Sequence, residues 1–361
     1  MKKSLFVVAM ASLALASCSK DEQSKVAAVN PDVITFKSSV LSVRGTEIGN
    51  DLPSMFVTAF DKNGKTYFTE TPFNRDGATD SFKSNPEYRW PGDGGKVKFY
   101  CYAPEAVKQD AAMSLTDTEK KLSNFAPKAA VKDQLDFIVA YAEGTKGDGN
   151  GVDVKFMHQL TQIKLKAMCK NATYTCKIAG VRIARPVSKG TFTFPEAKDA
   201  NGSWTLSTEE ADKQIYEINL VNPVDLTEAA QSLMADNGGA MLLPQTILPW
   251  DPTNNPKNET TLGKKRGAYI SVKLVATSTT GGQVLFDGWS AVPFPANTTL
   301  EAGKTYEYTL DYSNGLGKVD PESPDGGGDK PNPGDDILGG NISFRVNVTD
   351  WEVVDRKIDL K

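Results

Sequence analysis

The chain contains one short strand-like segment after another, and this recurrence limits most strongly the folds open to it. Each segment alternates apolar with polar residues and is rich in β-branched or aromatic side chains. The segments are KVKFYCYA (96–103), LDFIVAYA (135–142), VDVKFM (152–157), QIKLKAMC (162–169), CKIAGVRIA (176–184), IYEINLV (215–221), AYISVKLVAT (268–277) and TYEYTLDY (305–312). Clusters of Gly, Pro, Asn and Asp separate them. Such spacing predicts an all-β fold of sandwiches, in which one face of each strand packs inward and the other meets solvent.

Two stretches have helical features and are expected to form short helical insertions on this β scaffold. They are LTDTEKKLSNF (115–125) and DLTEAAQSLMAD (225–236). The second stretch begins at Asp225, a residue type that caps helix N-termini well, and it places Leu226 and Leu233 on one helical face. The expected fold class is therefore all-β with helical insertions.

The N-terminus has the pattern of a bacterial secretory signal that ends in a lipid attachment site. Lys2 and Lys3 form a positive region, a short apolar run covers residues 5–15, and small residues precede Cys18. A cysteine at this boundary resembles a lipobox, in which residues 1–17 are removed and Cys18 is acylated. The chain would then be anchored to a membrane rather than spanning it. The alternative is a cleaved soluble signal in which the cysteine is incidental.

Two further features bear on where the chain is placed. Residues 19–22, SKDE, resemble the acidic tag that carries some Gram-negative lipoproteins to the outer face of the outer membrane. No later stretch has the roughly 18 consecutive apolar residues that a transmembrane helix needs. We therefore expect an outer-membrane lipoprotein exposed at the cell surface.

Composition and motifs argue against nucleic-acid binding and against catalysis. The net charge is −4, and basic and acidic residues are mixed along the chain without a basic stripe. His158 is the only histidine, which excludes a His-rich metal site and favours a structural, hydrogen-bonded role. The Gly-rich stretch at 144–153 lacks the ligand spacing of an EF-hand and is expected to be a hairpin loop. With no nucleophile elbow or P-loop, we expect no enzyme activity, no cofactor and no metal site.

Besides Cys18, the chain has three cysteines, Cys101, Cys169 and Cys176. An odd number leaves at least one thiol without an intramolecular partner. Cys169 and Cys176 flank KNATYT, which has the composition of a hairpin turn, and a bridge between them requires that the two residues pair directly. Reduced cysteines that serve as small core residues are the equal alternative.

The C-terminal region combines a linker-like segment with a strand. Residues 313–340 contain eight Gly and four Pro among 28 residues, with acidic residues that keep such a segment solvated. The segment that follows, 341–361, has apolar residues at alternate positions, as a strand requires. These residues are Ile342, Phe344, Val346 and Val348. A single strand is not stable alone, so it either returns to its own domain or completes the sheet of a neighbouring subunit.

Four stretches together resemble, in chain order, the recurring strands of the fimbrillin family, the lipoprotein pilins of type V pili. They are QLDFIVAYAEG, VDVKFMHQLTQIKLKA, LEAGKTYEYTLDY and ISFRVNVTDWEV. The resemblance covers nearly the whole mature chain and is specific in combination with the lipobox. It implies two transthyretin-like β-sandwich domains, expected at 45–170 and 171–312 with the boundary near 168–175. It also implies polymerisation outside the cell with other pilin subunits.

The resemblance further implies that an arginine-specific protease removes the first strand together with the lipid anchor, here residues 18–44. Arg44 is the first arginine of the chain and precedes Gly45, so the family's processing site falls between these two residues. A donor segment from another subunit then fills the vacated groove, and residues 341–361 are the expected donor. The alternative is that Arg44 ends a strand in an uncleaved accessory protein.

The strand ahead of Arg44 is the expected plug, which keeps the precursor monomeric. Its apolar side chains are Ile34, Phe36 and Val40. An open apolar groove beside an unpaired strand edge would otherwise promote aggregation. Each buried side chain of this kind contributes about 1.5–3 kcal/mol, so the plug should not leave until the chain is cut.

Three functions fit this sequence: a structural pilus subunit, a tip or accessory adhesin of the same family, and a surface glycan-binding β-sandwich lipoprotein. The third requires the tryptophans to converge on one carbohydrate-stacking platform. The tryptophans are Trp90, Trp204, Trp250, Trp289 and Trp351. They are dispersed along the chain, which favours core or rim packing.

Overall fold

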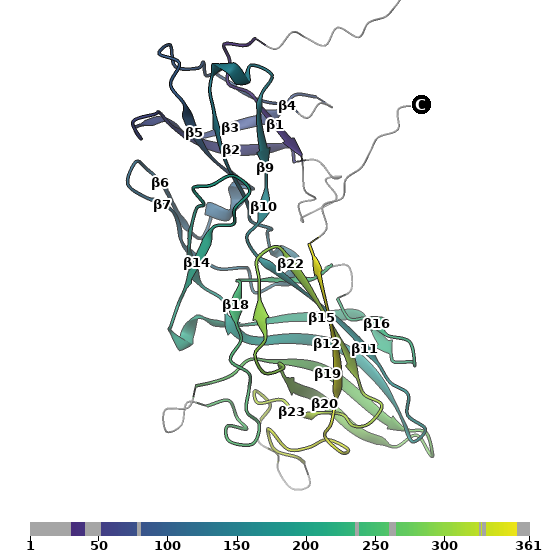
Figure 1. Ribbon diagram of the computed structural model, residues 1–361. Helices are drawn as coiled ribbons and strands as arrows, with labels where there is room; N and C mark the ends of the chain where they lie inside the picture. The colour runs from purple at the N-terminus through teal and green to yellow at the C-terminus, as the bar shows by residue number, and fades with distance from the viewer. Residues whose placement is uncertain are drawn as a thin grey trace, which may run out of the picture.

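The computed structural model describes residues 30–39, 52–77, 81–234, 238–259, 265–324, 326 and 330–351. Within those ranges every long regular element is a β-strand, and the helical elements are short 3-10 helices (Figure 1). The 3-10 helices are η1 (Glu105–Lys108), η2 (Val131–Asp133), η3 (Lys146–Asp148) and η4 (Glu210–Asp212). The protein is therefore all-β, as the alternating segments predict.

An eight-stranded sheet forms one end of the molecule, at the top of Figure 1. In order across the sheet its strands are β10 (Met157–His158), β8 (Ile138–Gly144), β5 (Val97–Ala103), β2 (Ser54–Phe60), β3 (Thr66–Arg75), β4 (Ser81–Ser84), β1 (Phe36–Ser39) and β9 (Val152–Lys155). β9, at one end, contacts β8, near the other end, so the sheet curls around its own apolar core. That core is rich in aromatic side chains, which bury more area per residue than aliphatic ones.

Two five-stranded sheets form the other end. The first contains β16 (Gln231–Ser232), β11 (Thr161–Met168), β22 (Lys304–Asp311) and β24 (Ser343–Asp350), with β17 (Ala240–Leu242) also paired to β11. The second contains β15 (Lys213–Asp225), β12 (Tyr174–Val187), β19 (Tyr269–Ser278), β20 (Val284–Pro293) and β23 (Lys318–Val319). Fully buried side chains from both sheets, such as Leu165 and Leu274, meet in one core. The arrangement follows from the period of two, which turns alternate residues of each strand inward.

A smaller sheet and a third core lie between the two ends (Figure 1). The sheet contains β14 (Ser203–Leu206), β13 (Gly190–Thr193), β7 (Lys120–Phe125) and β6 (Ala112–Leu115), and a separate pair is formed by β18 (Gln245–Thr246) and β21 (Thr299–Leu300). The core combines Tyr102 of β5, Phe192 of β13 and Met241 of β17. It therefore joins strands that belong to different ends of the molecule.

Neither expected helical insertion forms, so that prediction is wrong. The stretch 115–125 contains β7, which pairs with β6 and β13. In the stretch 225–236, β16 pairs with β11, and the Leu233 N–H donates to the Leu165 carbonyl at 2.8 Å. Apolar residues at helical spacing favour a helix only weakly over so short a stretch. Here the edge of β11 offers backbone hydrogen bonds, and the stretch pairs with it instead of forming a helix.

The segment 313–340, whose composition is that of a linker, is docked on the protein wherever it is described. Leu316, Val319 and Ile337 are buried in the core, and β23 pairs with β20. The Ile337 N–H donates to the Gly317 carbonyl at 2.9 Å. The prediction of a solvated linker is therefore wrong for this part of the chain. Burial of three apolar side chains is enough to hold a short segment on the protein, although its average composition is polar.

Two segments expected to be hairpin turns, around 168–175 and at 144–153, connect strands that do not pair with each other. β11 and β12, on either side of residues 168–175, belong to different sheets but line the same core. The chain therefore passes through 168–175 without leaving that core. The loop at 144–153 joins β8 to β9, which are not hydrogen-bonded neighbours in the sheet order, so it is not a hairpin loop.

Candidate functional site

The first described strand, β1, lies inside the eight-stranded sheet and has a partner on each side. Phe36 lies opposite Phe82 of the antiparallel strand β4 and opposite Val152 of the parallel strand β9. Beside the strand, the Val152 N–H donates to the Thr35 carbonyl at 2.9 Å, and the Ile34 N–H donates to a carbonyl of the segment before β5. Removal of β1 would therefore leave two facing strand edges without a partner.

The apolar side chains of β1 and of the residues just before it are buried in the core. Ile34 and Phe36 are both 0% exposed. The Phe36 ring meets the rings of Phe73 and Phe99 edge-on, with centroid distances of 4.8 and 5.0 Å. Edge-to-face contacts add about 0.5–1.5 kcal/mol to the burial of each ring. The space that Phe36 fills is consequently shaped for an aromatic side chain.

Several residues singled out in the sequence lie outside the described residues. They are the lipidation residue Cys18, the plug residue Val40 and the processing pair Arg44 and Gly45. In the chain, Arg44 and Gly45 fall between β1 and β2.

The last described strand, β24, lies at the edge of its sheet and has one partner. It pairs antiparallel with β22 of the same chain from Ser343 opposite Asp311 to Asp350 opposite Lys304. Ile342 and Phe344 are half-buried against the C-terminal core. Val346 and Val348 are 39% and 50% exposed. The alternating apolar face predicted from the sequence is present, but this edge position covers only its first half.

The end of β24 is held by Trp351, a contact that sequence analysis missed. The indole lies parallel to the His158 imidazole, with ring centroids 4.3 Å apart and planes inclined by 4°. His158 is buried, and its Nδ1 lies 2.7 Å from Asp136 Oδ2. The backbone N–H of Trp351 donates to the Gly303 carbonyl at 2.8 Å. His158 thus has the structural, hydrogen-bonded role expected of it, and it also forms the docking surface for the end of the C-terminal strand.

The two strands have closely similar sequences. VITFKSSV (33–40) and NISFRVNV (341–348) match at Ile, at a small hydroxyl residue, at Phe and at a basic residue in four consecutive positions. Because alternate residues of a strand share a face, Ile342 and Phe344 are spaced as Ile34 and Phe36 are. Comparison of the two ends of the chain would have shown this match, but its meaning depends on the burial of β1.

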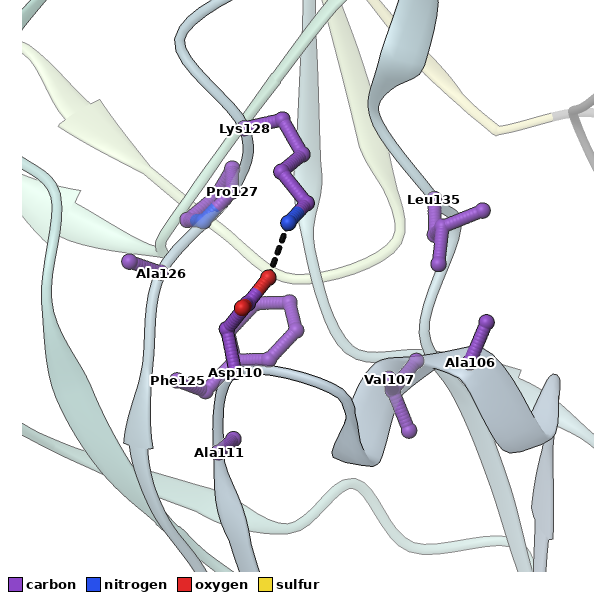
Figure 2. Close-up of a pocket in the computed structure, with 9 residues that line it drawn as sticks. All are labelled: Ala106, Val107, Asp110, Ala111, Phe125, Ala126, Pro127, Lys128 and Leu135. Carbon is purple, nitrogen blue, oxygen red and sulfur yellow. Dashed lines mark hydrogen bonds and ion pairs between the residues drawn. The ribbon is translucent and has the colours of Figure 1, made fainter.

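A small cavity and the described His, Cys, Asp and Glu side chains give no alternative site with clear chemistry. Figure 2 shows a small cavity beside η1, with Lys128 and Asp110 ion-paired at it. Its volume of ≈ 20 Å³ is close to the space of one water molecule. Among the described residues, no group of three or more His, Cys, Asp or Glu side chains is arranged to hold a metal ion. None of the helices in the described part of the chain is long and apolar enough to cross a bilayer.

The five tryptophans do not form one platform. Trp90 packs against Phe99, and the other contacts of the tryptophans are likewise with separate residues in separate parts of the fold. The ring of Trp289 is covered by the Arg182 guanidinium, whose central carbon lies 3.7 Å from the ring centroid. The described geometry therefore does not supply the stacked indoles that a glycan-binding surface of this kind would need.

Comparison with known proteins agrees with this fold. The structure is similar to that of a fimbrial protein from Bacteroides vulgatus, with a TM-score of 0.54 and 16% sequence identity over 89% of this chain and 100% of that chain. It is also similar to a candidate cell adhesion protein from Parabacteroides distasonis, with a TM-score of 0.50 and 12% identity over 89% of this chain and 100% of that chain. At these identities the similarity shows a shared fold.

No curated protein matches the sequence. The sequence profile of the family described as fimbrillin-like matches residues 46–351, which is most of the chain. We conclude that the chain belongs to the fimbrillin-like family and is a fimbrial protein of the cell surface rather than an enzyme.

Proposed function

We propose that this protein is a structural subunit of a cell-surface fimbria that polymerises by strand exchange. It is exported as a lipoprotein through acylated Cys18 and held in the outer membrane. An arginine-specific protease then cuts between Arg44 and Gly45, and β1 leaves with the anchor. Residues 341–361 of a neighbouring subunit fill the vacated slot.

The observation that carries this proposal is the match between a buried strand inside one sheet and a largely exposed strand at the edge of another. Ile34, just before β1, and Phe36 of β1 face the core, and Ile342, just before β24, and Phe344 of β24 have the same spacing. A donor that enters in the direction of β1 would place Phe344 between Phe73 and Phe99. The added strand would also satisfy both backbone edges that β1 leaves.

Charge supports the same register. Lys37 lies opposite Asp153 of β9, and the residue that corresponds to Lys37 in the donor is Arg345. A cross-strand pair of opposite charge contributes about 0.2–1 kcal/mol, and a register shifted by one residue would turn Phe344 to the solvent side. The proposed register therefore puts Ile342, Phe344 and Arg345 in the places of Ile34, Phe36 and Lys37.

Burial favours the exchange once β1 is gone. In its own subunit β24 leaves the side chains of Val346 and Val348 substantially exposed, and Phe344 is only half-buried. Full burial of a side chain of this size contributes about 1.5–3 kcal/mol. Transfer of the strand from an edge into a slot with two partners gains apolar burial and a second set of backbone hydrogen bonds.

We also propose that the chain is organised as two transthyretin-like β-sandwich units. The eight-stranded sheet with its core forms the first, and the two five-stranded sheets with theirs form the second. Because residues on both sides of 168–175 share one core, the junction is placed between β10 and β11 rather than at 170/171. The slot of β1 then belongs to the first unit and the donor strand to the second.

The experiment compares assembly of the purified, lipid-free protein before and after cleavage by an arginine-specific protease. We expect the cleaved protein to form fibres, seen by electron microscopy and as a high-mass peak in size-exclusion chromatography. Phe344→Asp should abolish fibres because it brings a charge into the slot of Phe36. Asn347→Asp is the matched control, since it adds the same charge to the exposed face of the same strand, and should still assemble.

The processing step has its own control. Arg44→Lys keeps the positive charge but removes the residue that the protease recognises, so the variant should stay uncut and monomeric. Fibres formed by Phe344→Asp at the level of the unmodified protein would contradict the strand-exchange proposal. Normal cleavage and assembly of Arg44→Lys would instead place the processing site elsewhere.

A further inference from the structure

Cys169 and Cys176 are buried in the C-terminal core, and two adjacent residues bond to their backbones. The Cys169 N–H donates to the Thr227 carbonyl, and the Leu226 N–H donates to the Cys176 carbonyl, each at 2.8 Å. Cys169 follows β11, and Cys176 lies in β12. They are 7% and 2% exposed and belong to the same core cluster. A hydrogen bond between the two thiols lowers the pKa of Cys169 and raises that of Cys176. Both thiols are free in the structure, and the fold brings these two cysteines, with six residues between them in the chain, to one place in the core.

The third described cysteine is excluded as a partner for either of them. Cys101 lies in the core of the eight-stranded sheet, in a different cluster. Burial raises the pKa of its thiol. The Cys169 thiol, in contrast, also donates to the carbonyl of Tyr312 at 3.6 Å, so it is oriented at the end of β22. The fold therefore allows Cys169 to pair with Cys176 and not with Cys101.

We propose that Cys169 and Cys176 form a disulfide bond when the protein is exported, and that this bond joins the two sheets of the C-terminal core. Extracytoplasmic compartments are oxidising, and the cell-surface location of this family places the chain there. The inference requires only export and not strand exchange. The bond would lie beside Tyr312, where the chain leaves β22 toward β24.

The oxidation proceeds by thiol–disulfide exchange with an oxidoreductase that carries a reactive disulfide. The Cys169 thiolate attacks one sulfur of that disulfide, forms a mixed disulfide and displaces the other sulfur as a thiolate. The Cys176 thiolate then attacks the Cys169 sulfur and releases the oxidoreductase in its dithiol form. Two protons and two electrons leave the substrate, and the oxidoreductase takes up both electrons.

Peptide mapping tests the proposal directly, because trypsin cuts after Lys170, between the two cysteines. Protein is prepared from the cell envelope after free thiols have been blocked by alkylation, and it is digested without reduction. We expect peptides 167–170 and 171–177 to be joined at a mass about 2 Da below their sum, and to separate on reduction. The same chain made in the cytosol should give both peptides singly.

A Cys101→Ala variant is the matched control and should leave the joined pair of peptides unchanged. The reduced and oxidised forms of the unmodified protein should also differ in Tm, with the oxidised form melting higher, because the bond restricts the unfolded chain. Recovery of both peptides singly and fully alkylated from the envelope protein would overturn the proposal. This outcome leaves fibre formation untouched, so it is distinguishable from failure of the proposed function.

Discussion

β1 and β24 share a four-residue pattern but lie in opposite surroundings. Residues 34–36 are buried beside or within a strand that has a partner on either side, and residues 342–345 lie along an outer edge with one partner. The first pattern closes the core of its sheet, whereas the second leaves much of its apolar face in contact with solvent. The comparison indicates that the shared pattern suits a strand in the interior of a sheet. At the edge beside β22, β24 leaves part of its apolar face unburied.

The largest expected effect separates the two strands by stability. Phe36→Ala should lower the free energy of unfolding of the uncleaved protein by about 3–5 kcal/mol, because a fully buried ring with two aromatic contacts is lost. Urea denaturation followed by circular dichroism measures this change. A loss near zero would mean that β1 is not an integral part of the folded precursor.

A smaller effect is expected at the corresponding position of the other strand. Phe344→Ala should lower the free energy of unfolding of the same uncleaved protein by about 1 kcal/mol, since its side chain is only half-buried. The same urea titration, carried out in parallel with Phe36→Ala, measures the ratio between the two strands. If the two substitutions prove equally destabilising, β24 is a permanent strand of its own sheet and the comparison fails.

The smallest expected effect is local and concerns the end of β24. Trp351→Ala removes the stack on His158 and should lower stability by about 0.5 kcal/mol, the low end for an aromatic pair, because the indole is only half-buried. Hydrogen exchange should accelerate at the β24 amides that bond to β22, while the amides between β1 and β9 keep their protection. Trp351→Phe retains an aromatic ring and should restore most of the protection. Equal acceleration in both regions would show that the stack supports the whole fold.

Much of the fold could be predicted from the sequence because strand alternation is a local property. The segments that became β5, β8, β11 and β22 were all expected, since their inward-facing residues recur at every second position. The expected helix at 225–236 failed for the opposite reason, because its outcome depended on the edge of β11, which is distant in the chain.

The candidate site divides in the same way. Ile34 and Phe36 were expected to be buried plug residues, and the structure places both in the core. The contact of Trp351 with His158 could not be predicted, because the two residues are far apart in the chain and neither has a local pattern that identifies its partner. The similarity between β1 and β24 was visible in the sequence but had no meaning until one strand was seen buried and the other exposed.

The sequence by itself determined the all-β class and the apolar face of each strand, because side-chain alternation depends only on the extended backbone. Tertiary structure alone decided that β1 lies between β4 and β9, that β24 lies on the edge beside β22, and that the buried residues Leu316, Val319 and Ile337 hold the described parts of the segment 313–340 on the protein. Each of these depends on pairing between residues distant in the chain. The free energy of such pairing comes from backbone hydrogen bonds and buried area that exist only when both partners are in place.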